Sequence, residues 1–137
     1  MDPTGGYSGT PLVKKLGIKE GNSILIVNPP SDYIELVGGL PPNIHHALSG
    51  ETEIDFIHYF ETTLSSLEDK IFFLKEQLAR NGMIWISWPK GGSGMETDLN
   101  RDLIREFILQ TELVDVKVCS VNEIWSGLKF VIRKELR

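Results

Sequence analysis

Residues 83–90 read Met-Ile-Trp-Ile-Ser-Trp-Pro-Lys, and this stretch decides the fold. Its apolar, β-branched and aromatic side chains are typical of a strand that is buried on both faces. Pro89 ends the strand, the glycine-rich segment 91–94 follows, and a helical pattern begins soon after. A strand, a glycine-rich loop and a helix in this order predict an open α/β sheet, which binds ligands at the carboxyl ends of its strands.

Other apolar runs predict the remaining strands. Residues 23–28 are apolar and β-branched, as expected of a parallel strand, and residues 54–60 show a similar pattern. Residues 43–49 form a weaker strand candidate. Residues 114–121 and 127–133 are separated by a short connection, so we expect them to form an antiparallel hairpin.

Capping residues and apolar spacing predict the helices. We expect two short helices, at residues 12–16 and 32–37. Ser65 and Glu68 form a capping box that predicts the start of a longer helix, with leucine and isoleucine at spacings of three and four. We expect residues 81–82, Asn-Gly, to end that helix. Thr97 is the candidate cap of the last helix.

Helices and strands alternate along the chain, which argues for an α/β fold. We predict a mostly parallel, Rossmann-like sheet with helices on both faces, ending in an antiparallel hairpin. The 137 residues fit a single domain, residues 1–137. Within it, the small, polar and glycine-rich residues 1–9 are expected to form a loose N-terminal tail.

The composition argues against several classes of function. The chain carries a net charge of −5, which disfavours binding to nucleic acid and to anionic membrane surfaces. No apolar run approaches the roughly 20 residues that span a bilayer, and the first residues lack the features of a signal peptide. The single cysteine, Cys119, excludes an intrachain disulfide, so we expect a cytoplasmic protein.

Several blocks of the sequence resemble an uncharacterised family of small bacterial proteins, a domain of unknown function. The blocks that carry this resemblance are residues 6–12, 15–19, 88–90, 97–99, 114–119 and 125–129. Together they cover most of the chain. The resemblance implies no activity, because none is assigned to that family.

A second resemblance, one of architecture, is to the Rossmann-like methyltransferases that use S-adenosylmethionine. Residues 16–28 are similar to the approach and first strand of that fold, and residues 54–57 resemble its fourth strand. Residues 74–87 look like its next helix, glycine and fifth strand, and the terminal hairpin looks like its last two strands. The resemblance implies a methyltransferase-like sheet.

The sequence departs from that family after the first strand. Such enzymes carry a glycine-rich turn there, so that the cofactor can approach the backbone. Residues 28–32 instead read Asn-Pro-Pro-Ser-Asp, and two prolines remove two backbone N–H donors. The chain between Pro30 and Ile54 is also too short for the usual two further strand–helix units. We therefore expect a cut-down fold with no cofactor, and the departure argues against S-adenosylmethionine.

The carboxyl edge of the predicted sheet gathers the candidate binding residues. These are Asn28, Glu61, Thr62, Trp88, Lys90, Glu123, Trp125 and Ser126. A tryptophan at a strand end offers a flat apolar wall, and a lysine beside a carboxylate offers charge recognition or proton transfer. In the alternative interpretation, Trp88 and Trp125 pack on each other and Lys90 is solvated.

Other features favour ordinary structural roles. We interpret segment 91–94 as a flexible loop, because acidic residues near the following helix would repel a phosphate. His45 and His46 are adjacent, so on a strand they point to opposite faces and cannot ligate one metal ion. We expect no metal site, with His58 an ordinary hydrogen-bonded histidine and Cys119 a buried small hydrophobe.

Two functions of different classes follow. The first is a noncatalytic domain that binds an unknown small molecule or protein, favoured by the missing glycine turn and the missing nucleophile–base pair. The alternative is a small enzyme that acts on an anionic metabolite at the carboxyl edge. In it, Lys90 contacts the anion, Glu61 is an acid or base, and Trp88 and Trp125 form walls. A homodimer through an exposed strand or apolar helix faces is a third hypothesis.

Overall fold

The computed structural model describes residues 11–137, and the tail expected at residues 1–9 lies outside them. The strands are β1 (Ser23–Val27), β2 (His45–His46), β3 (Ile54–Phe60), β4 (Leu78–Pro89), β5 (Leu113–Ser120) and β6 (Trp125–Ile132). The helices are α1 (Leu12–Leu16), α2 (Tyr33–Val37), α3 (Leu64–Gln77), α4 (Arg101–Ile108) and the 3-10 helix η1 (Lys134–Leu136). Within residues 11–137, none of these helices has the length and apolar character needed to cross a bilayer.

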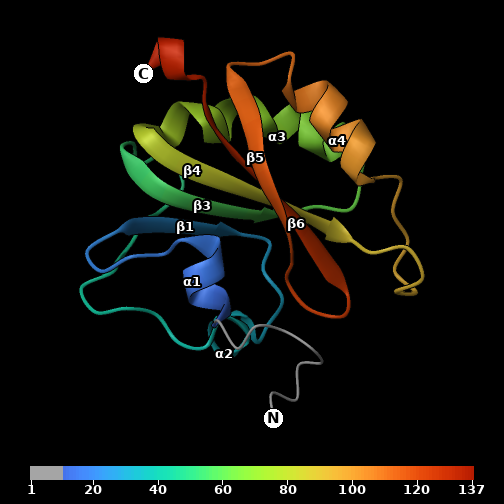
Figure 1. Ribbon diagram of the computed structural model, residues 1–137, viewed down its shortest axis with the longest axis horizontal. Coiled ribbons are helices and arrows are strands. Elements are labelled where there is room, and N and C mark those ends of the chain that lie inside the picture. Colours follow the sequence, from blue (N-terminus) through green and yellow to red (C-terminus); the bar gives the residue numbers. More distant parts are fainter. Residues whose placement is uncertain (1–10) are drawn as a thin grey trace.

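The six strands form one sheet in the order β2-β1-β3-β4-β6-β5 (Figure 1). β2, β1, β3 and β4 pair in parallel, whereas β6 is antiparallel to both β4 and β5. This arrangement confirms the predicted α/β fold with a mostly parallel sheet and a terminal hairpin. It also places β6 inside the sheet and leaves β5 at one edge.

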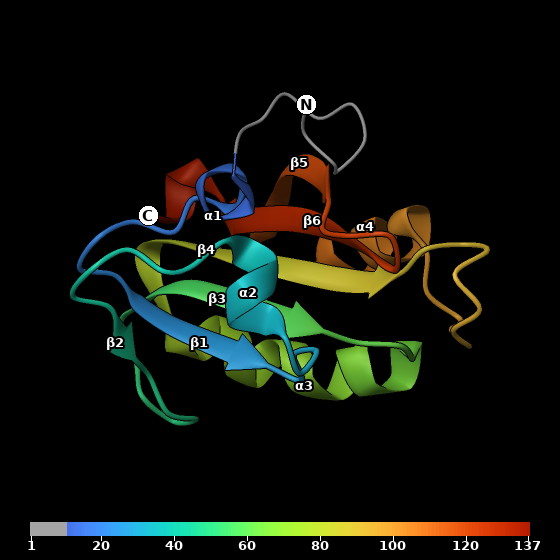
Figure 2. The ribbon, with the colours of Figure 1, turned by 90° about the horizontal axis from the view of Figure 1, so that it is seen from below.

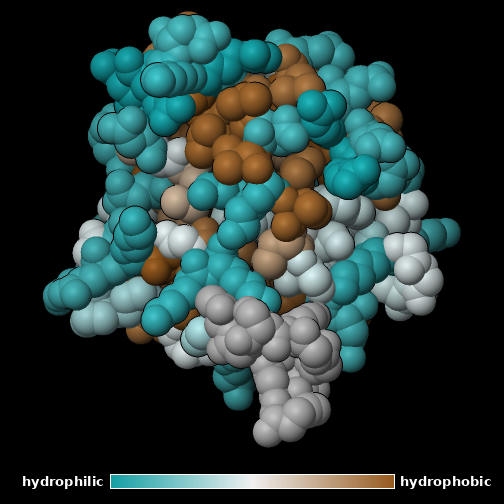
Figure 3. Space-filling model, viewed as in Figure 1, coloured by the Kyte–Doolittle hydropathy of each residue, from teal (hydrophilic) through white to brown (hydrophobic). Residues whose placement is uncertain are grey.

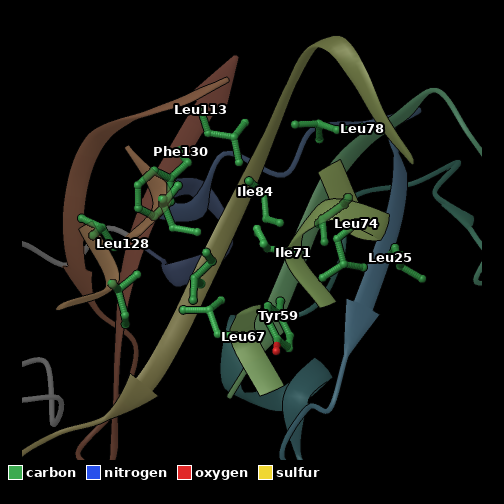
Figure 4. Packing of buried hydrophobic residues seen from close by; sticks show 14 of the residues in the cluster. Leu25, Tyr59, Leu67, Ile71, Leu74, Leu78, Ile84, Leu113, Leu128 and Phe130 are labelled. Atoms are coloured by element: carbon green, nitrogen blue, oxygen red, sulfur yellow. The ribbon is translucent and has the colours of Figure 1, made fainter. Parts of the chain in front are cut away.

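Helices cover both faces of the sheet, as predicted. α3 and α4 share one apolar cluster with inward-facing residues of β1, β3, β4 and β6 (Figure 4). α1 and α2 pack on the opposite face, away from α3, in a second cluster (Figure 2). Because successive residues of a strand point to opposite faces, Ile84 and Ile86 of β4 enter the first cluster and Trp85 enters the second. Fully burying each isoleucine side chain stabilises the fold by about 1.5–3 kcal/mol.

Two helices begin at caps other than those expected. Thr63, and not Ser65, caps α3, and Asn100, and not Thr97, caps α4. Each true cap has extended backbone, and its side-chain oxygen accepts a hydrogen bond from the N–H group three residues later. The sequence offers several polar residues near each helix start, and the pattern alone does not choose among them.

The boundary between α3 and β4 also differs from the expectation. α3 ends at Gln77 and the chain enters β4 directly, with Leu78 paired to Ile54. Asn81 and Gly82 therefore lie within the strand and do not end the helix, which corrects the prediction. A side chain at Gly82 would place its Cβ 2.8 Å from the Ile54 carbonyl oxygen, so the glycine allows β3 and β4 to approach closely.

Candidate functional site

The eight candidate residues lie along one edge of the sheet. They follow β1, β3 or β4, lie at the end of β4 in the case of Trp88, or belong to the turn and first residues of β6, which runs the opposite way. Their side chains divide between the two faces of the sheet and the loops beyond it. What each can do depends on which polar groups of the protein already contact it.

Glu61 is buried, with 8% of its surface exposed. Both of its carboxylate oxygens accept hydrogen bonds from neighbouring residues. Oε1 accepts a hydrogen bond from the Tyr59 hydroxyl at 2.5 Å. Oε2 accepts from the N–H groups of Thr62 at 2.8 Å and Thr63 at 3.3 Å. The Lys70 ammonium lies 3.8 Å from Oε1. The carboxylate therefore ties the end of β3 to the start of α3, where unpaired helix N–H groups need acceptors.

Thr62 holds the loop after β4 against the end of β3. Its carbonyl accepts hydrogen bonds from the Thr97 hydroxyl at 2.6 Å and from the Asp98 N–H at 3.3 Å. Asp98 in turn accepts from the Leu64 N–H at 2.8 Å, so this acidic residue supports the first turn of α3. The far end of the glycine-rich segment 91–94 is thus attached to the edge of the sheet.

The two tryptophans of the candidate set lie on opposite faces. Trp88 pairs with Ser126, and Trp125 pairs with Pro89 one position further, so the two indoles point apart. Trp88 joins the α3–α4 cluster, and Trp125 joins the α1–α2 cluster, where it meets Phe60 edge-to-face at 5.1 Å. The interpretation that these tryptophans pack on each other is therefore wrong. Their exposures of 7% and 8% leave little ring surface for a ligand.

Lys90 contacts the β5–β6 turn and is partly exposed. Its ammonium donates to the Ser120 hydroxyl at 2.7 Å, and its N–H donates to the Ile124 carbonyl at 2.7 Å. Asn122 organises the same turn, because its Oδ1 accepts from the N–H groups of the second and third residues after it. Sequence reasoning missed Asn122, although asparagine before a strand is a turn signal. Glu123 lies exposed at the tip.

Asn28 ends β1 in the left-handed conformation, with a φ of 57°. Its side-chain amide donates to the Phe60 carbonyl at 3.3 Å and so joins the ends of β1 and β3. Asparagine tolerates this conformation better than most residues, which explains how the turn forms without glycine. The prolines at 29 and 30 follow directly and offer no N–H donor to a ligand.

A buried polar network lies beneath α2. The His58 Nδ1 is 2.8 Å from the Tyr33 hydroxyl, and its Nε2 is 2.7 Å from the Ser87 hydroxyl. The imidazole also stacks on Phe60 with 4.2 Å between ring centroids. Burial lowers the pKa of His58 to about 3, so the ring is neutral at physiological pH. Ser87 and His58 are both fully buried, which makes this a structural network and confirms the expected role of His58.

Within residues 11–137, no group of three or more His, Cys, Asp or Glu side chains gathers as a metal ion would require. His45 and His46 are exposed on β2, and His45 Nε2 lies 2.8 Å from a Glu51 carboxylate oxygen. Cys119 is half-buried beside the α1–α2 cluster, and burial raises the pKa of its thiol.

An apolar groove, here called the α3 groove, lies between α3 and the outer side of β1. Residues 47–53 join β2 to β3 without a helix, although parallel crossovers usually contain one, so no helix covers this part of β1. The groove has a volume of about 640 Å³. Its apolar walls include Leu25, Val27, Ala47, Leu48, Phe73 and Leu74. Leu48 and Phe73 are 72% and 49% exposed.

The fold is similar to solved methyltransferase structures. A methyltransferase dependent on S-adenosylmethionine from Aquifex aeolicus matches with 15% identity and a TM-score of 0.59, over 88% of this chain and 87% of that one. A TehB-like methyltransferase from Corynebacterium glutamicum matches with 12% identity and a TM-score of 0.58, over 89% and 85%. Magnesium protoporphyrin IX methyltransferase from Synechocystis, with bound SAH, matches with 10% identity and a TM-score of 0.54, over 89% and 78%.

These similarities establish a methyltransferase-like fold for this chain. No protein-family model matches the sequence, and no curated protein matches it either. The fold therefore has structural support, whereas the resemblance to the uncharacterised bacterial family rests on the sequence blocks alone.

The residues that follow β1 and β2 differ from those that usually hold a nucleoside cofactor. Such cofactors are held by backbone N–H groups of a glycine turn and by a carboxylate on the ribose hydroxyls. The turn after β1 offers two prolines, and β2 is followed by Ala47 and Leu48. The next carboxylate, Glu51, is already bonded to His45 and to the Leu48 N–H.

Proposed function

We propose that this chain is a noncatalytic ligand- or protein-binding domain with a cut-down methyltransferase-like fold. The observation that carries the proposal is the burial and hydrogen bonding of Glu61. This residue is the acid or base that a reaction at the carboxyl edge would use. Its oxygens accept hydrogen bonds from Tyr59, Thr62 and Thr63, and its side chain is buried. A proton transfer to substrate would have to break contacts that hold β3 to α3.

The proposal includes the absence of S-adenosylmethionine binding. The support is the Asn-Pro-Pro turn after β1 and the apolar residues after β2, which leave the cofactor without its usual donors and acceptor. Solved structures of similar fold include one with bound SAH, so the question has to be tested directly.

Thermal unfolding with the cofactor is the direct test. A ligand that binds only the native state at about 100 times its Kd stabilises it by about 2.7 kcal/mol, which raises the Tm by several degrees. We expect no change in Tm with S-adenosylmethionine or S-adenosylhomocysteine, measured beside an active methyltransferase as the positive control. A rise of several degrees with either compound contradicts the proposal.

The α3 groove supports the binding part of the proposal. Its volume of about 640 Å³ lies in the range of small-molecule sites, which are mostly apolar with a few polar groups. Mass spectrometry of compounds that copurify with the wild-type protein and with Phe73→Asp tests this use. A compound retained by the wild type and lost from the variant places binding in the groove, and equal retention excludes the groove.

The alternative function is a small enzyme that acts on an anionic metabolite at the carboxyl edge. Lys90 favours it, because this half-buried ammonium is held at the end of β4 by Ser120. Lys90 would contact the anion, Glu61 would act as acid or base, and Trp88 and Trp125 would form walls. Under this alternative, Lys90→Ala abolishes ligand binding and leaves the circular dichroism spectrum unchanged. Unaltered binding by that variant removes the alternative.

We keep a homodimer and a cytoplasmic location as predictions. The exposed edge strand β5 supports the homodimer, because Val116 and Val118 are 50% and 51% exposed there. An unpaired strand edge with apolar side chains is a surface on which a second chain can pair. Sedimentation equilibrium tests this assembly, and a monomer mass at about 100 μM contradicts it.

A further inference from the structure

Five lysines from four separate segments lie around the β5–β6 hairpin. They are Lys15, Lys19, Lys90, Lys117 and Lys129, and together they are called the lysine cluster. Lys117 of β5 pairs directly with Lys129 of β6 across the antiparallel ladder. Lys129 in turn pairs with Trp85 of β4.

α1 brings two more lysines to the same place. The Trp85 indole N–H donates to the Leu16 carbonyl at 2.8 Å, which fixes the end of α1 over β4. Lys15 and Lys19 flank this contact in the sequence. Lys19 acts electrostatically on Lys129, and Lys15 acts on the thiol of Cys119, which neighbours the pair on β5. The cluster is therefore built by the fold and does not come from one lysine-rich segment.

The side-chain charges that act on Lys129 and on Cys119 are positive. Those acting on Lys129 come from Lys117 and Lys19, and those acting on Cys119 come from Lys15, Lys117 and Lys90. None of the five salt bridges within residues 11–137 involves Lys19, Lys90, Lys117 or Lys129. Acidic residues are plentiful, because the chain has 19 of them and a net charge of −5. Within residues 11–137, the charges that act on Lys129 and Cys119 include none from an acidic residue.

Such an arrangement costs stability in the absence of a counter-ion. Like charges directly opposite each other on neighbouring strands are destabilising. Burial, with Lys117 and Lys19 nearby, lowers the pKa of Lys129 below its usual value. A lysine on an edge strand can protect the edge from pairing, which would explain Lys117. The same explanation fails for Lys129, which is half-buried on the interior strand β6.

We infer that the lysine cluster binds a small phosphate-bearing anion, with the phosphate between the ammonium groups of Lys117 and Lys129. Side chains directly opposite on antiparallel strands have Cβ atoms about 5 Å apart, so two flexible lysines can reach one phosphate. Ammonium groups bind phosphate as point charges through charge-assisted hydrogen bonds. Lys19 and Lys90 supply further positive charge at the sides. On the side of the molecule shown in Figure 3, hydrophilic residues lie beside a hydrophobic area.

This site is separate from the α3 groove, and it shares only Lys90 with the carboxyl edge. The groove lies on the α3 face of the sheet, whereas Lys129 and Cys119 lie on the α1 face. The inference goes beyond the proposed function, because it assigns a second binding surface and a ligand class. If no ligand binds in the α3 groove, the inference about the lysine cluster still stands.

The test uses pyrophosphate as the probe, with sodium chloride matched to the same ionic strength. Calorimetric titration and Tm are measured for the wild type, Lys117→Gln, Lys129→Met and Lys134→Gln. Lys134→Gln is the matched control, because it removes one exposed lysine outside the cluster. We expect the wild type and the control to bind alike, and each cluster variant to bind about tenfold more weakly. Lys129→Met keeps the apolar stem of the side chain, so its fold should persist.

Cys119 provides a second readout, since it is the only cysteine in the chain. Nearby lysines act to lower the pKa of its thiol, and a bound anion would offset them. Pyrophosphate should therefore slow alkylation by neutral iodoacetamide in the wild type and in Lys134→Gln, but not in Lys117→Gln. No binding beyond the chloride control overturns the inference, as does equal binding by all four proteins. Binding only to vesicles that contain phosphatidic acid overturns it as well, because the source of phosphate would then be a membrane.

Discussion

Two polar regions lie on the same face of the sheet and differ in whether their polar groups have partners. In the network of Tyr33, His58 and Ser87, every ring nitrogen and hydroxyl has a partner, and burial keeps the imidazole neutral. In the lysine cluster, Lys117 and Lys129 face each other as like charges and remain in contact with solvent. A satisfied buried network supports the fold, whereas unbalanced charge that the fold brings together is better explained by a ligand.

Acidification should produce the largest change in the free energy of unfolding, because it protonates the buried network. The pKa of His58 is lowered from 6.5 to about 3 in the folded protein, so the unfolded chain binds this proton more tightly. The stability supplied by this group is full above about pH 6.5 and is lost as the pH falls towards 3, by about 5 kcal/mol. Urea unfolding at about pH 7 and pH 4 measures the part of this loss that falls between them, about 3 kcal/mol. A pH profile for His58→Gln that matches the wild type would show that another group is responsible.

Glu61→Ala should give the next largest effect, because it tests whether the carboxyl edge is structural like the network. The variant leaves the Tyr59 hydroxyl and two N–H groups at the start of α3 without their acceptor. We expect a loss of about 3 kcal/mol in the free energy of unfolding, measured by urea denaturation. Glu123→Ala is the control, since this glutamate is exposed in the hairpin turn and should change stability by less than about 0.5 kcal/mol. Equal, small effects of both variants would leave Glu61 available for chemistry.

Tyr33→Phe should have a smaller effect within the same network. It removes only the hydroxyl that meets His58 Nδ1, and one buried ring nitrogen then lacks a partner. The expected loss is about 1–3 kcal/mol, measured by urea denaturation near pH 7. Leu36→Ala serves as a comparison for lost packing on the same helix, because its side chain is partly buried without a polar role. A variant as stable as the wild type would mean that solvent reaches His58.

The sequence predicted the strands better than it predicted the site. The apolar runs of residues 23–28 and 54–60 became β1 and β3 almost to the residue, because continuous burial selects one type of side chain. The sequence did not predict the start of β4, because residues 78–82 continue the helical pattern of the preceding residues. They form a strand in the structure because Leu78 pairs with Ile54. Local pattern cannot supply a partner that lies elsewhere in the chain.

The same limit explains the site. The sequence placed Trp88 and Trp125 at one edge, but their opposite directions follow from a register that pairs Trp88 with Ser126. The facing of Lys117 and Lys129 likewise depends on the register of the hairpin, which a bulge shifts after Asp115. A shift of one residue in the register therefore changes which side chains share a face.

Lys117→Gln should produce the smallest effect, and one of opposite sign. Removing one of two facing charges relieves repulsion, so without any anion the variant should be more stable by about 0.3–0.5 kcal/mol at low ionic strength. At about 1 M salt the difference should vanish, because screening shortens the range of the repulsion to about 3 Å. Urea unfolding at both salt concentrations measures this, with Lys134→Gln as the control for loss of one positive charge. A destabilised Lys117→Gln would show that this lysine supports the fold, and the contrast with the buried network would then disappear.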